Sequence, residues 1–241
     1  MPLSLTVLGC DGTYPGPGGA CSGYLLECEG TRVWLDAGAG TLANLQLHVS
    51  IEDLDAVVVT HSHPDHWTDL EHFAVACKWV IGRTGVPVYA PEGLDLLLRI
   101  GSAAGVLAWH PVGDAETVRV GAISLTFSRT DHPPPTLAVR ADGAGRSLGY
   151  SADSGPGWSL ASLGPGLHLL LCEATFLFDK EGTLGHMSAR QAGASAREAG
   201  VERLVITHLR PRVDREKARA EAAAAFGGDV TVAATGDRYV A

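Results

Sequence analysis

Three histidines and one aspartate fall within residues 61–66, which read HSHPDH. Imidazole and carboxylate groups are ligands that Zn²⁺ accepts in proteins. Side chains two residues apart in an extended loop point to the same side, so His61 and His63 can bind one ion while Asp65 and His66 are left for a second. A solvated polar turn would give no reason for three histidines so close together. The segment therefore predicts a metal site.

Three further candidates stand where later strands are expected to end, namely His132, Asp153 and His208. A lone histidine or aspartate at a strand end is commonly a cap or a satisfied polar group. Together with the cluster, however, they complete a ligand set for two ions. The predicted sets are His61, His63 and His132 for the first ion and Asp65, His66 and His208 for the second, with Asp153 bridging both. Imidazole and carboxylate without thiolate favour two Zn²⁺ ions and leave Mn²⁺ or Fe open.

A buried strand and an amphipathic helix must position the histidine cluster. Residues 55–60 form a short apolar run rich in β-branched side chains, which predicts a buried strand that ends at His61. Apolar residues then recur at helical spacing from Leu70 to Ile81. We therefore expect the cluster on a strand-to-helix loop.

The rest of the chain alternates strand and helix patterns. Further strands are predicted at 3–8, 24–28, 31–35, 86–89, 106–112, 117–129, 137–140, 147–151, 167–172, 204–207 and, as the last, 230–233. Helices are predicted at 91–100, from a capping box at Ser188 to Gly200, and at 213–226. Because no repeat, charge run or linker interrupts the pattern, we expect residues 1–241 to form one domain of two sheets with helices outside.

Composition narrows the classes of function. The 241 residues include 18 basic and 27 acidic side chains, a net charge of −9, and no Lys or Arg precedes Arg32. Extended nucleic-acid binding is therefore not expected. No apolar run is long enough to span a membrane and no basic leader begins the chain, so we expect a cytoplasmic protein with no membrane partner. Five cysteines without C-x-x-C spacing argue against a disulfide framework and a thiolate zinc site.

The ligand pattern resembles that of the metallo-β-lactamase superfamily. The resemblance rests on the H-x-H-x-D-H run, on His132, on the turn at residues 151–154 and on the Thr-His pair at 207–208. It implies a four-layer αββα sandwich of two mixed sheets flanked by helices. The segments CEATF at 172–176, GHMS at 185–188 and ITH at 206–208 narrow the likeness to the ribonuclease Z-like phosphodiesterases.

This likeness also implies roles for individual residues. Glu173 would orient His186, which would protonate the leaving group, and Asp65 would be a ligand that also handles a proton. Asp36, in the segment LDAG at 35–38, matches a motif that supports the ligand loop. An ordinary turn carboxylate is the open alternative for Asp36. Proteins of this branch are commonly dimers, so a homodimer is compatible with the sequence.

The sequence departs from the ribonuclease Z pattern in three places. Its long arm that grips tRNA lies between the positions of His132 and Asp153, where this chain has only residues 133–152. Its basic loop corresponds to residues 13–23, which contain no Lys or Arg, and Cys172 stands where that family often has histidine. The first two departures argue against the processing of tRNA 3′ ends, which stays an alternative function.

Two arginines follow the ligand His208 directly. Arg210 or Arg212 could hold a substrate phosphate through a forked pair of hydrogen bonds, whereas a solvated loop is the alternative. The leading hypothesis is a dinuclear zinc phosphodiesterase acting on a small phosphodiester, such as a cyclic nucleotide or a short oligonucleotide. Hydrolysis of a lactone or thioester at the same centre is the second hypothesis, and under it Glu173 and His186 would need a different purpose. A metal-binding module without turnover is the third, and a missing ligand would have favoured it.

Overall fold

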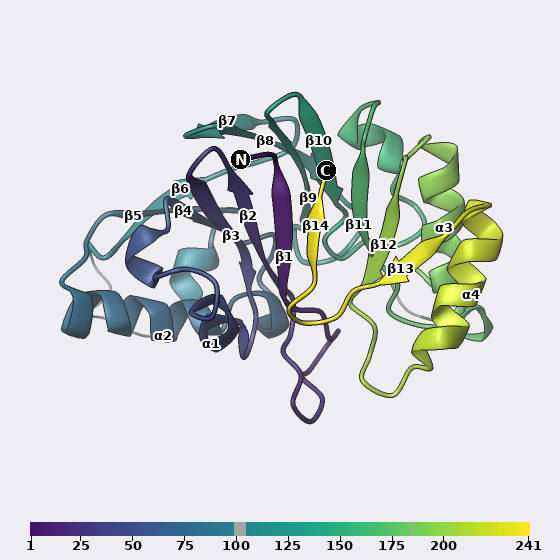
Figure 1. The fold of residues 1–241 in the computed structure, drawn as a ribbon. Helices are drawn as coiled ribbons and strands as arrows, with labels where there is room; N and C mark the ends of the chain where they lie inside the picture. Colours follow the sequence, from purple (N-terminus) through teal and green to yellow (C-terminus); the bar gives the residue numbers. More distant parts are fainter. Residues whose placement is uncertain (99–104, 184) are drawn as a thin grey trace.

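The computed structural model describes residues 1–98, 105–183 and 185–241, which form two mixed sheets that pack face to face (Figure 1). Seven described strands make up the first sheet, in the order β14-β1-β2-β3-β4-β5-β6. The second sheet also has seven described strands, in the order β13-β12-β11-β10-β9-β8-β7. Both sheets combine four antiparallel strands with a parallel extension, so the two halves of the chain share one topology.

The strands have the following bounds. The first sheet contains β14 (Arg238–Val240), β1 (Ser4–Gly9), β2 (Gly23–Cys28), β3 (Thr31–Ala37), β4 (Ala56–Val58), β5 (Val86–Ala90) and β6 (Leu107–Pro111). The second contains β13 (Val230–Val232), β12 (Leu204–Thr207), β11 (Leu169–Glu173), β10 (Arg146–Tyr150), β9 (Leu137–Gly143), β8 (Ile123–Arg129) and β7 (Thr117–Val120).

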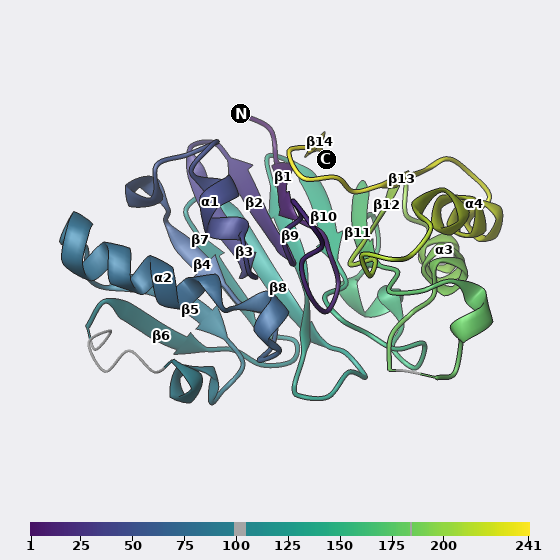
Figure 2. The same ribbon diagram turned by 90° about the horizontal axis from the view of Figure 1, so that it is seen from below.

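Helices cover the outer face of each sheet, as the view from below shows (Figure 2). The first sheet carries α1 (Thr41–Leu45) and α2 (Asp69–Ala76), and the second carries α3 (Ala189–Glu198) and α4 (Arg215–Phe226). The four layers form the αββα sandwich that the sequence predicted. None of the helices within the described ranges combines the length and the apolar character that crossing a membrane requires.

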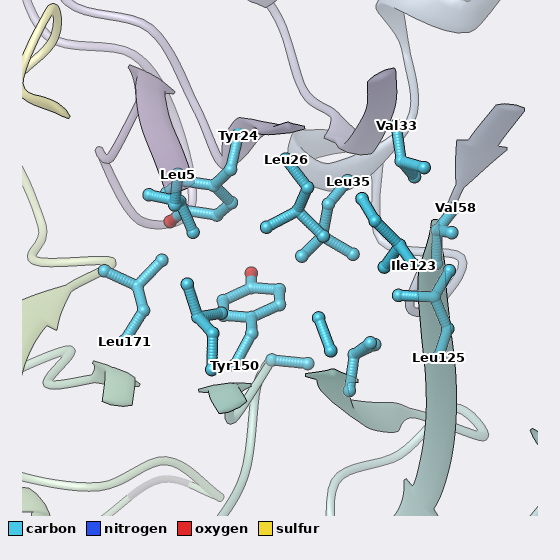
Figure 3. Packing of buried hydrophobic residues seen from close by; sticks show 14 of the residues in the cluster. Leu5, Tyr24, Leu26, Val33, Leu35, Val58, Ile123, Leu125, Tyr150 and Leu171 are labelled. Carbon is cyan, nitrogen blue, oxygen red and sulfur yellow. The ribbon is translucent and has the colours of Figure 1, made fainter. Parts of the chain in front are cut away.

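Alternation along the strands produces three apolar layers. In β2, Tyr24 and Leu26 point into the core between the sheets, whereas Leu25 points toward the helices of the first sheet. In β12, Val205 faces the core between the sheets and Ile206 faces the helices α3 and α4. This period of two is what a strand buried on both faces requires. Figure 3 shows the two inner faces meeting between the sheets.

Several predicted elements differ from those observed. The helix predicted at 91–100 is wrong in the described part, where a single 3₁₀ helix, Leu94–Leu97, follows Gly93 in a left-handed conformation (φ 90°); residues 99 and 100 lie outside the described ranges. The strand at Val230–Val232 is not the last, because β14 follows and pairs with β1. The capping box of Ser188 with Gln191 is confirmed, and α3 ends near Gly200 as expected.

Candidate metal centre

The predicted ligands come from four loops that meet at one edge of the sandwich. Residues 61–66 follow β4 and include the 3₁₀ turn Pro64–His66. His132 lies between β8 and β9, Asp153 follows β10 and His208 follows β12. All are buried except His63, which is half-buried. The fold thus brings together side chains that lie up to about 150 positions apart in the sequence.

Asp153 presents its two carboxylate oxygens to two different groups of imidazoles. Its Oδ2 lies 3.5 Å from Nε2 of His61 and 3.8 Å from Nε2 of His132. Its Oδ1 lies 3.3 Å from Nε2 of His66 and 3.4 Å from Nε2 of His208. A carboxylate placed between two ligand sets in this way can bridge two cations.

The remaining two residues complete these sets. Nδ1 of His63 lies 3.1 Å from Nε2 of His61 and 3.2 Å from Nε2 of His132. Oδ2 of Asp65 lies 3.2 Å from Nε2 of His208 and 3.7 Å from Nε2 of His66. A tetrahedral Zn²⁺ with nitrogen ligands at 2.0–2.1 Å separates them by about 3.3 Å. The spacing in both sets is therefore close to the one that a shared ion imposes.

Two of these atoms, Nε2 of His66 and Oδ1 of Asp153, are also buried with no hydrogen-bond partner among the residues that the structure describes. Buried polar atoms are nearly always satisfied, and an orphaned pair 3.3 Å apart calls for a group between them. A cation would accept the imidazole lone pair and neutralise the carboxylate. The residues present fit bound metal ions.

Hydrogen bonds at Nδ1 leave Nε2 of four histidines free for a ligand role. The Nδ1 partners are Thr60 Oγ1 for His61, Asp36 Oδ2 for His66, the Gly185 carbonyl for His132 and Thr175 Oγ1 for His208. Such partners fix the tautomer and the ring orientation of metal-binding histidines. His63 instead turns its Nδ1 toward the other ligands.

Asp36 supports the ligand loop and does not serve as a simple turn carboxylate. Its Oδ1 accepts the Thr60 N–H at 2.8 Å, and its Oδ2 accepts the Thr60 hydroxyl at 2.9 Å, the His66 Nδ1–H at 2.7 Å and the Tyr150 hydroxyl at 2.9 Å. Asp36 (φ 57°), Ala152 (φ 49°) and His208 (φ 57°) all adopt the left-handed conformation, which is unfavourable for residues other than glycine. Such strain is retained where surrounding contacts hold it, as they do here around the ligands.

Burial keeps two of the histidines neutral. It lowers the pKa of His61 well below its usual value, and the neighbouring imidazole of His66 lowers it further. Burial and the nearby ring of His132 likewise lower the pKa of His63. Neutral imidazole is the form that binds a metal.

The carboxylates remain ionised in spite of their burial. Burial alone would raise the pKa of Asp65, but the rings of His66 and His208 lower it below the usual range. The pKa of Asp153 is likewise lowered against the effect of burial, chiefly by His208 and His66. His66 responds in the opposite direction, because the surrounding carboxylates, Asp153 foremost, outweigh burial and raise its pKa. The centre therefore provides anionic oxygen next to imidazole nitrogen.

Glu173 connects His186 to the ligand shell. Its Oε1 accepts the His186 Nδ1–H at 3.0 Å and the Ser154 N–H at 2.6 Å. Its Oε2 accepts the Thr175 hydroxyl at 2.6 Å, and Thr175 in turn contacts His208. Although burial opposes protonation of His186, the Glu173 carboxylate and its hydrogen bond raise the pKa of the imidazole.

A cavity of about 260 Å³ opens onto the cluster. Its walls are formed by Thr13, His63, Pro64, Asp65, Asp153, His186, His208 and Arg210. Nε of Arg210 is buried and has no hydrogen-bond partner in the described part of the chain, whereas Arg212 is exposed. The cavity thus combines ligand atoms, an imidazole held by a carboxylate, and one unsatisfied cationic donor.

Sequence reasoning missed the residues that hold the predicted ligands in place. The Thr13 N–H donates to Oδ2 of Asp65 at 2.8 Å, and Tyr150 contacts Asp36. Thr60 and Thr175 each accept from a histidine predicted to be a ligand. Position gave a signal for two of them, since Thr60 precedes the cluster and Thr175 follows Glu173 by two residues. Thr13 and Tyr150 carry no such signal.

Comparison with known proteins shows the family to which this chain belongs. The model of the β-lactamase superfamily domain matches residues 31–209, a span that contains all seven predicted ligands. The chain belongs to the β-lactamase superfamily. This member is a metallo-hydrolase, as its sequence relatives indicate.

Three relatives match this chain over nearly its whole length. The probable metallo-hydrolase YhfI of Bacillus subtilis is 32% identical over 97% of this chain and 98% of its own length. Its crystal structure has a TM-score of 0.91 at 29% identity and covers 99% of this chain and 100% of that one. Protein Rv1339 of Mycobacterium tuberculosis is 34% identical, covering 95% of this chain and 89% of that protein. Ribonuclease Z of Methanopyrus kandleri is 29% identical over 93% of each chain.

Proposed function

We propose that this metallo-hydrolase is a dinuclear zinc phosphodiesterase that acts on a small phosphodiester, such as a cyclic nucleotide or a short oligonucleotide. One observation carries the proposal: the cavity lined by Asp153, with its bridging geometry, is also lined by His186, which Glu173 holds from behind, and by Arg210, whose buried Nε has no hydrogen-bond partner among the described residues. A ligand set for two ions, a proton donor and an anion-binding group are what hydrolysis of a phosphodiester requires.

The ligand chemistry favours zinc. Imidazole and carboxylate without thiolate suit Zn²⁺, and Mn²⁺ or Fe would also be accommodated. When bound, two such ions would supply hydroxide at neutral pH and neutralise charge on the phosphoryl oxygens. His61, His63 and His132 would hold the first ion, and Asp65, His66 and His208 the second, with Asp153 shared.

The protein's own side chains would do the remaining work. The Arg210 guanidinium would bind the phosphate and orient it, since no described residue accepts a hydrogen bond from its buried Nε. Because Nδ1–H of His186 is engaged with Glu173, Nε2 is the ring nitrogen left to donate a proton to the departing oxygen. Asp65 also lines the cavity, where its carboxylate can accept a proton.

Features around the cavity favour a small substrate over tRNA. Residues 133–152, the interval in which ribonuclease Z would carry its long arm, are largely used by β9 (Leu137–Gly143) and β10 (Arg146–Tyr150). The loop at residues 13–23 contains no basic residue, and the chain has a net charge of −9. Few phosphates of a long nucleic acid could therefore be neutralised away from the metal centre.

A comparison of substrates on the zinc-loaded protein tests the proposal. Cyclic nucleotides and a short oligonucleotide would be measured beside precursor tRNA, a lactone and a thioester. We expect the highest kcat/KM for one of the small diesters. Turnover of the lactone or the thioester well above that of every diester would contradict it.

A further inference from the structure

Asp131 immediately precedes the ligand His132, yet its side chain contacts a different loop. Its Oδ1 accepts the N–H of Gly155 at 2.5 Å, and its Oδ2 accepts the N–H of Gly157 at 2.7 Å. Both glycines follow the bridging Asp153 within four residues. The Asp131 carboxylate thus joins the loop that carries His132 to the loop that carries Asp153.

The two loops are in close contact at this point. A Cβ atom added at Gly155 would lie 2.7 Å from Oδ2 of Asp131, and one added at Gly157 would lie 2.6 Å from it. Both distances are shorter than real Cβ contacts allow. The glycines are therefore needed for the backbone to reach the carboxylate.

A second hydrogen bond joins the same two loops. The Thr130 hydroxyl donates to the backbone carbonyl of Asp153 at 2.8 Å. Nε2 of His132 and Oδ2 of Asp153 then lie 3.8 Å apart, on two sides of the position expected for the first ion. The spacing of these two ligand atoms depends on how the loops are joined.

We propose that Asp131 is a positioning residue for the metal centre, which fixes the bridging Asp153 relative to His132 before a metal binds. The inference rests on the proposed two-ion site and adds a residue outside it. Metal binding is tightest when ligand atoms are already at the required spacing, and outer partners that orient ligands commonly contribute about 10- to 100-fold to metal affinity. The two hydrogen bonds of Asp131 supply this orientation.

Titration of the metal-free protein with Co²⁺ tests the role, because the d–d absorption reports ligand geometry without any measurement of turnover. In Asp131→Ala, we expect at least one binding step to weaken about 10-fold or more and the absorption band to change. Asp114→Ala is the matched control, since Oδ1 of Asp114 accepts the Arg129 N–H at 2.7 Å but the residue lies between β6 and β7 and adjoins none of the proposed ligands in the sequence. This control should titrate like the wild type.

A second variant keeps the test decisive if Asp131→Ala does not fold. Gly157→Ala keeps the Asp131 side chain, but the added methyl group displaces its carboxylate from the loop that follows Asp153. This variant should therefore reproduce the weakened Co²⁺ step. Gly113→Ala is its control, because among the described residues only the Glu116 carboxylate lies within 4 Å of the added Cβ, at 3.7 Å and beyond. If folded Asp131→Ala and Gly157→Ala bind Co²⁺ with the affinity and the absorption spectrum of the wild type, the inference about Asp131 is wrong while the proposed two-ion site still stands. A wild-type protein that binds no Co²⁺ would overturn the proposed two-ion site together with it.

Discussion

The hydroxyl group of Tyr150 donates a hydrogen bond of 2.9 Å to Oδ2 of Asp36, the oxygen that also accepts Nδ1–H of His66 at 2.7 Å. Tyr150 ends β10 in the second sheet, and Asp36 lies near the end of β3 in the first. The tyrosine ring is buried between the sheets in an edge contact with Tyr24, 5.0 Å between centroids (Figure 3). Packing between the sheets is thereby connected directly to a predicted ligand.

Removal of this hydroxyl group should affect both stability and metal binding. In Tyr150→Phe, Asp36 loses one of its hydrogen bonds while remaining buried, which should lower the free energy of unfolding by about 1–3 kcal/mol. His66 should also be held less firmly, so the affinity for zinc should fall. Urea unfolding of the metal-free protein and zinc competition with a chelator measure the two effects.

Tyr24→Phe is the control for this variant. It removes another buried hydroxyl from the same core, one that pairs with the Thr207 hydroxyl at 2.8 Å and makes no hydrogen bond to Asp36. We expect a comparable loss of stability with a smaller loss of zinc affinity. Equal losses of zinc affinity in both variants would show that the contact with Asp36 has no special effect.

The sequence was most informative where the chemistry is local. The spacing of residues 61–66 predicted a metal-binding loop between a strand and a helix, and the structure has β4 before this loop and α2 after it. Ser188 and Gln191 likewise identified the start of α3, because a capping box involves neighbours in the sequence. The two-sheet architecture followed from the family resemblance and from the order of strands.

The features that were missed depend on contacts between distant segments. The strand β14 has only three residues, two of them exposed, and it exists because it pairs with β1 at the other end of the chain. The contact of Tyr150 with Asp36 joins positions 114 residues apart. The helix predicted at 91–100 ignored Gly93, whose left-handed conformation prevents a helix from beginning at Pro91, and the extended backbone of Leu98 ends the 3₁₀ helix that follows. No short-range pattern contains this information.

Arg210 and Arg212 should differ in their effect on catalysis. Arg210→Ala removes a cationic donor from the cavity wall, so kcat/KM for a small phosphodiester should fall about 10- to 100-fold, the loss expected when a hydrogen bond to a charged group is removed. Arg212→Ala, at an exposed position, should stay close to the wild type. Steady-state kinetics of both variants decide the matter, and the reverse order of effects would assign phosphate binding to Arg212.

His186 should matter most when the leaving group is poor. A ribose alkoxide needs a proton as it departs, whereas nitrophenolate does not at neutral pH. His186→Ala should therefore reduce kcat for a cyclic nucleotide about 10²-fold or more relative to its effect on a nitrophenyl diester. Glu173→Gln should show the same preference with a smaller loss, because the imidazole remains but is less well oriented.

Metal content has to be measured in both variants, since an emptied site would impair the two substrates equally. If the metal stays bound and both substrates suffer alike, His186 is not the proton donor. The better explanation of His186 would then be a structural role, since it packs just before Ser188, the residue that caps α3.

Precursor tRNA should be a poor substrate. With β9 and β10 in place of an arm and no basic residue in the loop at 13–23, the protein can neutralise few phosphates beyond the cavity. Values of kcat/KM for precursor tRNA and for a cyclic nucleotide, measured under one set of conditions and at one salt concentration, provide the comparison. A clearly higher value for precursor tRNA would mean that tRNA is recognised through other surfaces.

The central claim is that Asp153 joins two metal sites, and elemental analysis of the purified protein tests it most directly. Because its Oδ1 and Oδ2 face different imidazole groups, the wild type should hold close to two transition-metal ions per chain, and Asp153→Ala should weaken the binding of both. A single tightly bound ion in the wild type, unchanged in Asp153→Ala, would contradict the account.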